Sequence, residues 1–228
     1  MATVAGLVPF TTIDFPGCLA AVVFFKGCPL RCPFCHNPEL QENDNKGEIS
    51  WSDVISFLSE RKGKLDGVVL SGGEPLMQLD IVEITKQIKE LGFKVGVHTS
   101  GVYPDKLREM ASYIDWVGLD IKAPWNKYDT LSGRPNIATK VQESLAFLLE
   151  KGIVFEARTT CDPTYLTPAD ILQIAQGIKE KGVKIYALQH YRTYPGDKNP
   201  PEQSAINSFF TPEALEPIKE SYSDLIIR

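Results

Sequence analysis

The chain has 228 residues and a formal net charge of −5, from 24 lysines and arginines against 29 aspartates and glutamates. Hydrophobic residues make up 43% and charged residues 23%, which is ordinary for a globular domain and excludes a disordered chain. The negative balance argues against binding to nucleic-acid phosphates, and no apolar run approaches the ~20 residues that span a bilayer. Because no secretory signal is visible, we expect one cytoplasmic domain over residues 1–228.

Helical and extended segments alternate along the chain. Apolar residues at helical spacing predict helices over 52–61, 80–91, 104–112, 139–151 and 167–181. Thr139 and Gln142 are expected to cap the fourth helix, and the fifth is expected to open with Thr167, Pro168 and Asp170. Runs of β-branched and aromatic residues predict six strands over 19–25, 67–70, 93–97, 116–119, 153–157 and 183–188. The alternation predicts an α/β domain with parallel strands, as an open sheet or a partial barrel. Polar segments 41–48 and 194–203 are expected to be surface loops.

Polar and ionisable residues stand where five of these strands end. They are Ser71-Gly72-Gly73-Glu74-Pro75, His98-Thr99-Ser100-Gly101, Asp120-Ile121-Lys122, Arg158-Thr159-Thr160 and Gln189-His190-Tyr191-Arg192. Polarity resumes at the end of any strand, so a single such run would carry little weight. Because α/β folds build their sites at the carboxyl ends of parallel strands, five runs together predict a polar ligand site there.

Three of the five cysteines lie in one short segment after the first predicted strand: Cys28, Cys32 and Cys35. Thiolates at this spacing can converge on an iron–sulfur cluster or on zinc. A structural zinc site needs four ligands, and the fourth would be His36 or the distant Cys18. A [4Fe–4S] cluster held by three cysteines instead leaves one iron open to a small molecule.

The cysteine spacing, with Phe34 directly before the last cysteine, resembles the signature of the radical S-adenosylmethionine (SAM) enzymes, and residues 72–75 resemble the Gly-Gly-Glu-Pro element of that family. The resemblance implies a partial (β/α)₆ barrel, an open TIM-like fold, with a [4Fe–4S] cluster on the three cysteines and SAM on the fourth iron. More narrowly, the chain is similar to glycyl-radical-enzyme activases, and among these to anaerobic ribonucleoside-triphosphate reductase activating proteins. The segments that carry this similarity are 8–14, 15–17, 35–38, 120–122, 128–133 and 158–160.

The resemblance also implies roles for individual residues. The expected SAM contacts are Phe34 near the adenine, Gly72, Gly73, Glu74 and Pro75 at the methionine amino group, and Thr99, Asp120, Lys122 and Arg158. The plainer alternatives are a packed Phe34, an Asp120–Lys122 surface ion pair and a structural salt bridge at Arg158. His98 stands where an activase has an acidic residue that helps to hold a monovalent cation. This weakens the case for that cation site and leaves His98 to hydrogen-bond SAM or Asp120.

The expected function is reductive cleavage of SAM and formation of a glycyl radical on a partner enzyme, an anaerobic (class III) ribonucleotide reductase, with flavodoxin or ferredoxin as electron donor. Two alternatives stay open. One is a small-molecule radical SAM enzyme that resembles the 7-carboxy-7-deazaguanine synthases. The other is a zinc-binding module without catalysis. Cys18 and Cys161 are expected to be buried apolar residues, and His36 a hydrogen-bonding residue of the loop.

Overall fold

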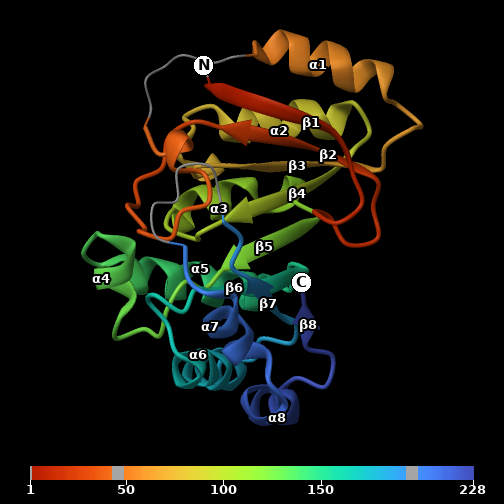
Figure 1. Ribbon diagram of the computed structural model, residues 1–228. Coiled ribbons are helices and arrows are strands. Elements are labelled where there is room, and N and C mark those ends of the chain that lie inside the picture. The colour runs from red at the N-terminus through yellow and green to blue at the C-terminus, as the bar shows by residue number, and fades with distance from the viewer. Residues whose placement is uncertain (1, 43–48, 194–199) are drawn as a thin grey trace.

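The computed structural model describes residues 2–42, 49–193 and 200–228, which form one eight-stranded sheet flanked by helices (Figure 1). The strands are β1 (Val4–Thr11), β2 (Ala20–Phe25), β3 (Gly67–Gly72), β4 (Lys94–Thr99), β5 (Trp116–Asp120), β6 (Phe155–Cys161), β7 (Tyr186–His190) and β8 (Ile226–Ile227). β1 is antiparallel to β2, and every later pair of neighbours is parallel. Each strand pairs with the next in sequence, so the sheet winds in one direction, and its end strands β1 and β8 do not pair with each other. This confirms the predicted α/β partial barrel.

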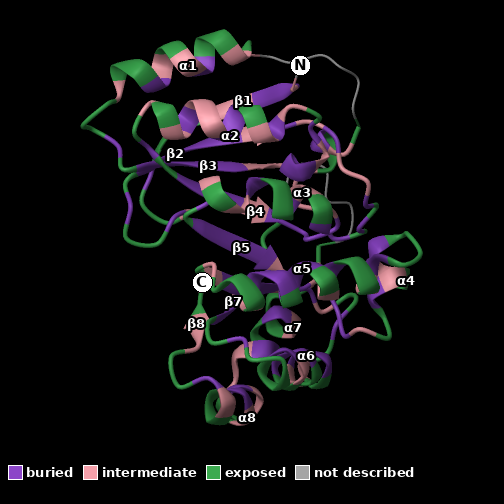
Figure 2. Cartoon of the chain, turned by 180° about the vertical axis from the view of Figure 1, so that it is seen from behind, coloured by how far each residue is buried: buried purple, intermediate pink, exposed green. Residues whose placement is uncertain are grey.

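The helices lie outside the sheet, with their outward faces exposed and the strands buried (Figure 2). They are α1 (Trp51–Glu60), α2 (Ile81–Glu90), α3 (Pro104–Met110), α4 (Tyr128–Ser132), α5 (Ile137–Lys151), α6 (Pro168–Glu180), α7 (Gln203–Asn207) and α8 (Pro212–Ser221). The five predicted helices are confirmed, with ends within two residues of the expected ones. Among the described residues, no helix has the length and apolar character needed to cross a membrane.

Side chains of the strands alternate between the two faces of the sheet. In β2, Val23 and Phe25 join the main core beneath the helices, whereas Val22 belongs to a smaller cluster on the concave face. Phe15, in the loop after β1, covers that concave face and stacks on Trp116 with ring centroids 5.7 Å apart. The loop after β1 therefore closes one end of the barrel interior and leaves the carboxyl ends of the parallel strands for a site.

Two strands, three helices and one cap differ from the expectation. β1, β8, α4, α7 and α8 were not predicted. The expected cap at Thr139 is wrong, because α5 begins at Ile137 and Thr139 lies inside it. The carboxylate of Asp129, in α4, accepts hydrogen bonds from the backbone N–H groups of residues 136, 137 and 138 instead. Because this cap comes from α4, a separate helix, the spacing of residues within α5 could not predict it.

The expected opening of α6 at Thr167, Pro168 and Asp170 is confirmed, and the structure shows that Thr167 and Asp170 form a capping box there. The two expected loops fall partly outside the described residues, because 43–48 and 194–199 are not described. Within the second of them, Gln203 begins α7 rather than lying in a loop.

Candidate cofactor site

A cavity of about 450 Å³ opens at the carboxyl ends of the parallel strands. The three clustered cysteines line it, together with residues from the ends of β3 to β7. The strand-end residues that line it are Ser71, Gly72, Gly73, His98, Thr99, Ser100, Asp120, Ile121, Lys122, Arg158, Thr160, Gln189 and Arg192. All five polar runs therefore contribute to one cavity, as their common position after parallel strands predicts.

The cysteine loop is held from both sides by backbone hydrogen bonds. The N–H of Cys28 donates to the carbonyl of Gln41 at 3.1 Å, near the end of the loop. The N–H of Arg31 donates to the carbonyl of Ser132 at 2.9 Å, at the end of α4. This second bond gives the segment 128–133 a structural role that sequence reasoning missed, because α4 supports the loop that presents the thiols.

The thiols of Cys28, Cys32 and Cys35 face the same cavity, whereas Cys18 and Cys161 do not line it. Burial raises the pKa of the Cys28 thiol to about 12 and also raises the pKa of Cys32. These thiols are therefore protonated in the metal-free chain, and binding of a metal centre must release their protons. Within the described ranges, no three His, Cys, Asp or Glu side chains converge closely enough to hold a single metal ion.

The backbone of the Gly-Gly-Glu-Pro segment approaches the cysteine loop too closely for side chains. Gly72 has φ +120°, and a Cβ there would lie 2.3 Å from the backbone N and O of Phe25. A Cβ on Gly73 would lie 2.4 Å from the carbonyl oxygen of Gly27. Only glycine allows this approach, and Gly72 and Gly73 line the same cavity as the three cysteines.

Glu74 is fully buried and does not line the cavity. Its carboxylate accepts hydrogen bonds from the hydroxyl of Thr99 at 2.7 Å, from the N–H of Ser100 at 2.9 Å and from the N–H of Leu76 at 3.2 Å. Burial raises the pKa of Glu74, and the hydrogen bonds from Ser100 and Thr99 oppose that shift. This placement supports a positioning role, in which Glu74 ties the Gly-Gly-Glu-Pro segment (with Pro75, also buried) to the end of β4. The expected contact between this carboxylate and a SAM ammonium group stays a prediction.

Asp120, Lys122 and Arg158 form one charged cluster at the wall of the cavity. Asp120 accepts from Arg158 Nη2 at 2.9 Å and lies 3.3 Å from Lys122 Nζ. Burial alone raises the pKa of Asp120, but Arg158 and Lys122 outweigh it and hold the pKa at about 2. Tyr128 supports the cluster, because its hydroxyl donates to the Asp120 carbonyl and accepts from the Lys122 N–H. The Asp120–Lys122 pair is therefore not an exposed surface ion pair, and the salt bridge of Arg158 lies at the wall of the cavity.

His98 is held by the loop after β1 rather than by Asp120. Its Nε2 donates to the backbone carbonyl of Asp14 at 2.8 Å, and its ring meets Trp116 edge-on. Burial, together with the positive charge of the nearby Arg158, lowers the pKa of His98 to about 3. His98 is therefore a neutral residue of the cavity wall at physiological pH, and its Nε2 is committed to the carbonyl of Asp14.

This burial predicts a loss of stability in acid. The folded-state pKa of about 3 lies below the ordinary 6.5, so below pH 6.5 the unfolded chain binds a proton that the folded chain excludes. At pH 5.5 the cost to the free energy of unfolding is about 1.4 kcal/mol. His98→Gln keeps an N–H donor for Asp14 and should remove this cost, measured by urea unfolding at pH 7.5 and 5.5. An equal loss of the free energy of unfolding in wild type and His98→Gln between pH 7.5 and pH 5.5 would contradict the burial of an uncharged imidazole.

Phe34 lies at the cavity wall and is buried at the same time. Its ring packs against Tyr165 with centroids 5.7 Å apart. Packing beneath the loop and a place near a bound adenine are compatible in this position. His36 and Asn37, the next residues of the cysteine loop, also line the cavity.

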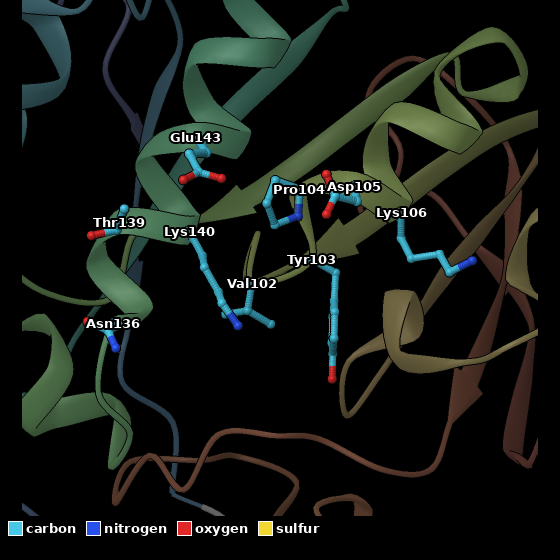
Figure 3. Close-up of a pocket in the computed structure, with 9 residues that line it drawn as sticks. All are labelled: Val102, Tyr103, Pro104, Asp105, Lys106, Asn136, Thr139, Lys140 and Glu143. Atoms are coloured by element: carbon cyan, nitrogen blue, oxygen red, sulfur yellow. The ribbon is translucent and has the colours of Figure 1, made fainter.

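A second cavity, of about 390 Å³, lies between the starts of α3 and α5 (Figure 3). Its lining includes Tyr103, Lys106, Lys140 and Glu143, and no cysteine. Figure 3 shows Tyr103 pointing away from both helices. Burial raises the pKa of Tyr103, and the charge of Glu74 adds to that shift. Because no residue of the cysteine loop lines this second cavity, the thiol-lined cavity is the better candidate for the reaction.

Comparison with known proteins decides the family. The profile of the radical SAM superfamily matches residues 22–163. The chain belongs to the radical SAM superfamily. It is 33% identical over 200 residues, 83% of this chain and 80% of the relative, to MJ1227 of Methanocaldococcus jannaschii, which carries the name of a glycyl-radical enzyme activating enzyme. It is 36% identical over 115 residues, 48% of each chain, to the pyruvate formate-lyase-activating enzyme of Clostridium pasteurianum. Within the superfamily the chain therefore belongs with the glycyl-radical enzyme activating enzymes.

Solved structures of the superfamily share the fold. A radical SAM methyltransferase from Sphaerobacter thermophilus matches with TM-score 0.68 and 14% identity, over 100% of this chain and 76% of that one. Streptococcus suis SuiB bound to S-adenosylmethionine matches with TM-score 0.66 and 18% identity, over 88% of this chain and 47% of that one.

The superfamily implies a [4Fe–4S] cluster and SAM, and the residues present fit both groups. Three thiols, the glycine backbone and the charged cluster share one cavity, and no fourth cysteine lines it. Membership in a cofactor-dependent enzyme family also removes the alternative of a zinc module without catalysis.

Proposed function

We propose that this enzyme generates a glycyl radical on an anaerobic ribonucleoside-triphosphate reductase. The observation that carries the proposal is the single cavity that brings three thiols together with the backbone of Gly72 and Gly73 and the cluster at Asp120. The activating-enzyme relatives support a glycyl-radical partner, and the segments 120–122, 128–133 and 158–160 favour the reductase as that partner.

In this proposal the protein supplies position and charge. Cys28, Cys32 and Cys35 would hold three irons of the cluster and leave the fourth for SAM. The reduced cluster and SAM, when bound, supply a carbon radical that removes a hydrogen atom. Lys122 would donate to the SAM carboxylate, because Arg158 shares the neutralisation of Asp120 and leaves part of the positive charge of Lys122 available. The backbone of Gly72 and Gly73, which lines the same cavity, would hold the methionine amino group.

The open barrel suits a protein substrate. β1 and β8 leave an unclosed side, through which a loop of the partner reaches the carboxyl ends of the strands. A glycine has no side chain to obstruct this approach. Flavodoxin or ferredoxin would supply the electron, and an anaerobic cytoplasm is the proposed setting, because oxygen degrades a cluster with an open iron.

The test is electron paramagnetic resonance of the partner. Reconstituted enzyme, SAM, a one-electron reductant and the reductase from the same genome are expected to give a glycyl-radical doublet. A reductase whose radical glycine is replaced by alanine is the matched control and should give none. SAM turnover that is accelerated by a small heterocycle, with no doublet on the reductase, would instead favour the 7-carboxy-7-deazaguanine synthase-like alternative.

A further inference from the structure

Three consecutive carbonyl groups, those of residues 25–27 at the entry to the cysteine loop, accept hydrogen bonds from one segment of the chain. The backbone N–H groups of Gly73 and Glu74 donate to the first and the third of these carbonyls, at 2.9 Å each. The carbonyl between them, on Lys26, accepts from the side-chain amide of Gln78 at 2.7 Å. The two outer bonds need no particular side chain, so the middle one is the bond that depends on residue type.

The side chain of Gln78 is buried, and its amide group is hydrogen-bonded at both ends. Its Nε2 donates to Lys26, and its Oε1 accepts from the backbone N–H of Thr3 at 3.1 Å. The N–H of Lys26 in turn donates to the carbonyl of Thr3 at 2.9 Å, which closes a ring of three hydrogen bonds. The amide of Gln78 thus joins β1 to β2 as a peptide group would, next to the paired residues Val4 and Phe25.

The backbone of Gln78 is fixed as well. Its N–H donates to the carbonyl of Pro75 at 3.1 Å and closes the single 3₁₀ turn over Pro75–Met77. Its carbonyl accepts from the N–H of Ile81, at the start of α2, at 3.4 Å. Loss of either bond to the side chain would leave a buried polar group without its partner, which costs more than the bond itself contributes. Gln78 is therefore a fixed link between the cysteine loop and the end of the Gly-Gly-Glu-Pro segment.

We propose that Gln78 is a positioning residue for SAM, because it sets the spacing between the cysteine loop and the Gly-Gly-Glu-Pro segment. This inference rests on the part of the proposed function in which SAM contacts both the cluster and the backbone of Gly72 and Gly73. Gln78 does not line the cofactor cavity, so it acts through Lys26 and not by touching SAM. A ligand held by two segments loses affinity when their spacing changes, and displacements of about 1 Å have large effects in such sites.

Gln78→Met tests this proposal, because methionine has a similar length and fills the buried space but cannot donate to Lys26. The reconstituted variant is expected to contain about four irons per chain, as the wild type should. It should bind SAM about tenfold more weakly, as for the loss of one buried hydrogen bond. Iron analysis and equilibrium dialysis of SAM measure these two quantities. The electron paramagnetic resonance spectrum of the reduced, SAM-saturated cluster should also differ from that of the wild type, because SAM is then held at a changed spacing.

Asp80→Ala is the matched control. The carboxylate of Asp80 accepts from the N–H of Ala2 at 2.9 Å, so it ties the same end of the first strand to the same segment without a bond to the cysteine loop. This variant should keep its irons and bind SAM within about twofold of the wild type. Gln78→Asn is a second test variant, in which the amide is one methylene too short to span from Thr3 to Lys26. It should show the same weaker SAM binding at full iron content, and it decides the test if Gln78→Met does not fold.

Four results would overturn the proposal: wild-type SAM affinity in the Gln78 variant, a loss of iron that accompanies the loss of SAM binding, an unchanged resonance spectrum, or an equal loss of SAM affinity in Asp80→Ala. The second and fourth of these would show that Gln78 only stabilises the fold. The proposed function fails separately, by the absence of a glycyl-radical doublet on the reductase with the wild-type enzyme. A normal doublet with the wild type, together with any of the four results, would end this inference alone.

Discussion

Replacing Cys32 with alanine is expected to abolish both cluster binding and SAM cleavage. Cys32 is the central and most buried of the three clustered cysteines, and among the described residues no cysteine outside these three lines the cavity to take its place. Anaerobically reconstituted wild-type protein should contain about four irons and four sulfides per chain. The variant should contain far less of each and should leave SAM intact after reduction. Iron and sulfide analysis, with chromatography of the SAM products, measures both effects.

Cys161→Ala is the matched control for this change. Cys161 is equally a buried free thiol, but it lies at the end of β6 and outside the cavity lining. Its replacement should cost about 1 kcal/mol of stability through the lost sulfur atom and leave the iron content unchanged. A wild-type protein that binds zinc without sulfide, or a Cys32→Ala variant that keeps its irons, would contradict the assignment of the cluster.

The parallel part of the fold could be predicted because each helix and strand carries its own local pattern. The stripe Ile81, Ile84 and Ile88 is buried on one side of α2, as helical spacing requires. The end strands carry weaker patterns. β1 contains Gly6 and Pro9, which are unfavourable inside strands, and it lies at the edge, where such residues are tolerated. β8 has two residues, too few to show any alternation.

In the candidate site, too, some features could be predicted from the sequence and others could not. Residues that line the cavity follow directly from strands, so their place at one edge could be predicted from the order of elements. The direction in which each side chain points could not be predicted in this way. The carboxylate of Glu74 turns toward Ser100, and Asp129 caps a helix that begins eight residues later. Both depend on how separate elements meet in three dimensions, and so does the partner of His98.

Gly73→Ala is expected to weaken SAM binding on the order of 100-fold, because displacements of about 1 Å have effects of this size in positioned sites. The added Cβ would lie 2.4 Å from the carbonyl oxygen of Gly27 and 2.6 Å from that of Leu40. Both atoms belong to backbone, so no side chain can rotate away. Either the Gly-Gly-Glu-Pro segment or the cysteine loop must move, and each forms one side of the cofactor cavity. We also expect a loss of about 2 kcal/mol in the free energy of unfolding, as for overpacking elsewhere in proteins.

Gly6→Ala separates this collision from the general effect of a glycine-to-alanine change. Gly6 has nothing within 4 Å of an added Cβ, and neither Gly6 nor Gly73 has a positive φ. The control should bind SAM as the wild type does, with stability within about 0.5 kcal/mol of it. Equilibrium dialysis of SAM against both reconstituted variants, with urea unfolding, measures the two effects. Wild-type affinity in Gly73→Ala would mean that the two segments can separate without loss of the site. The cysteine loop and the Gly-Gly-Glu-Pro segment would then not bind a common ligand.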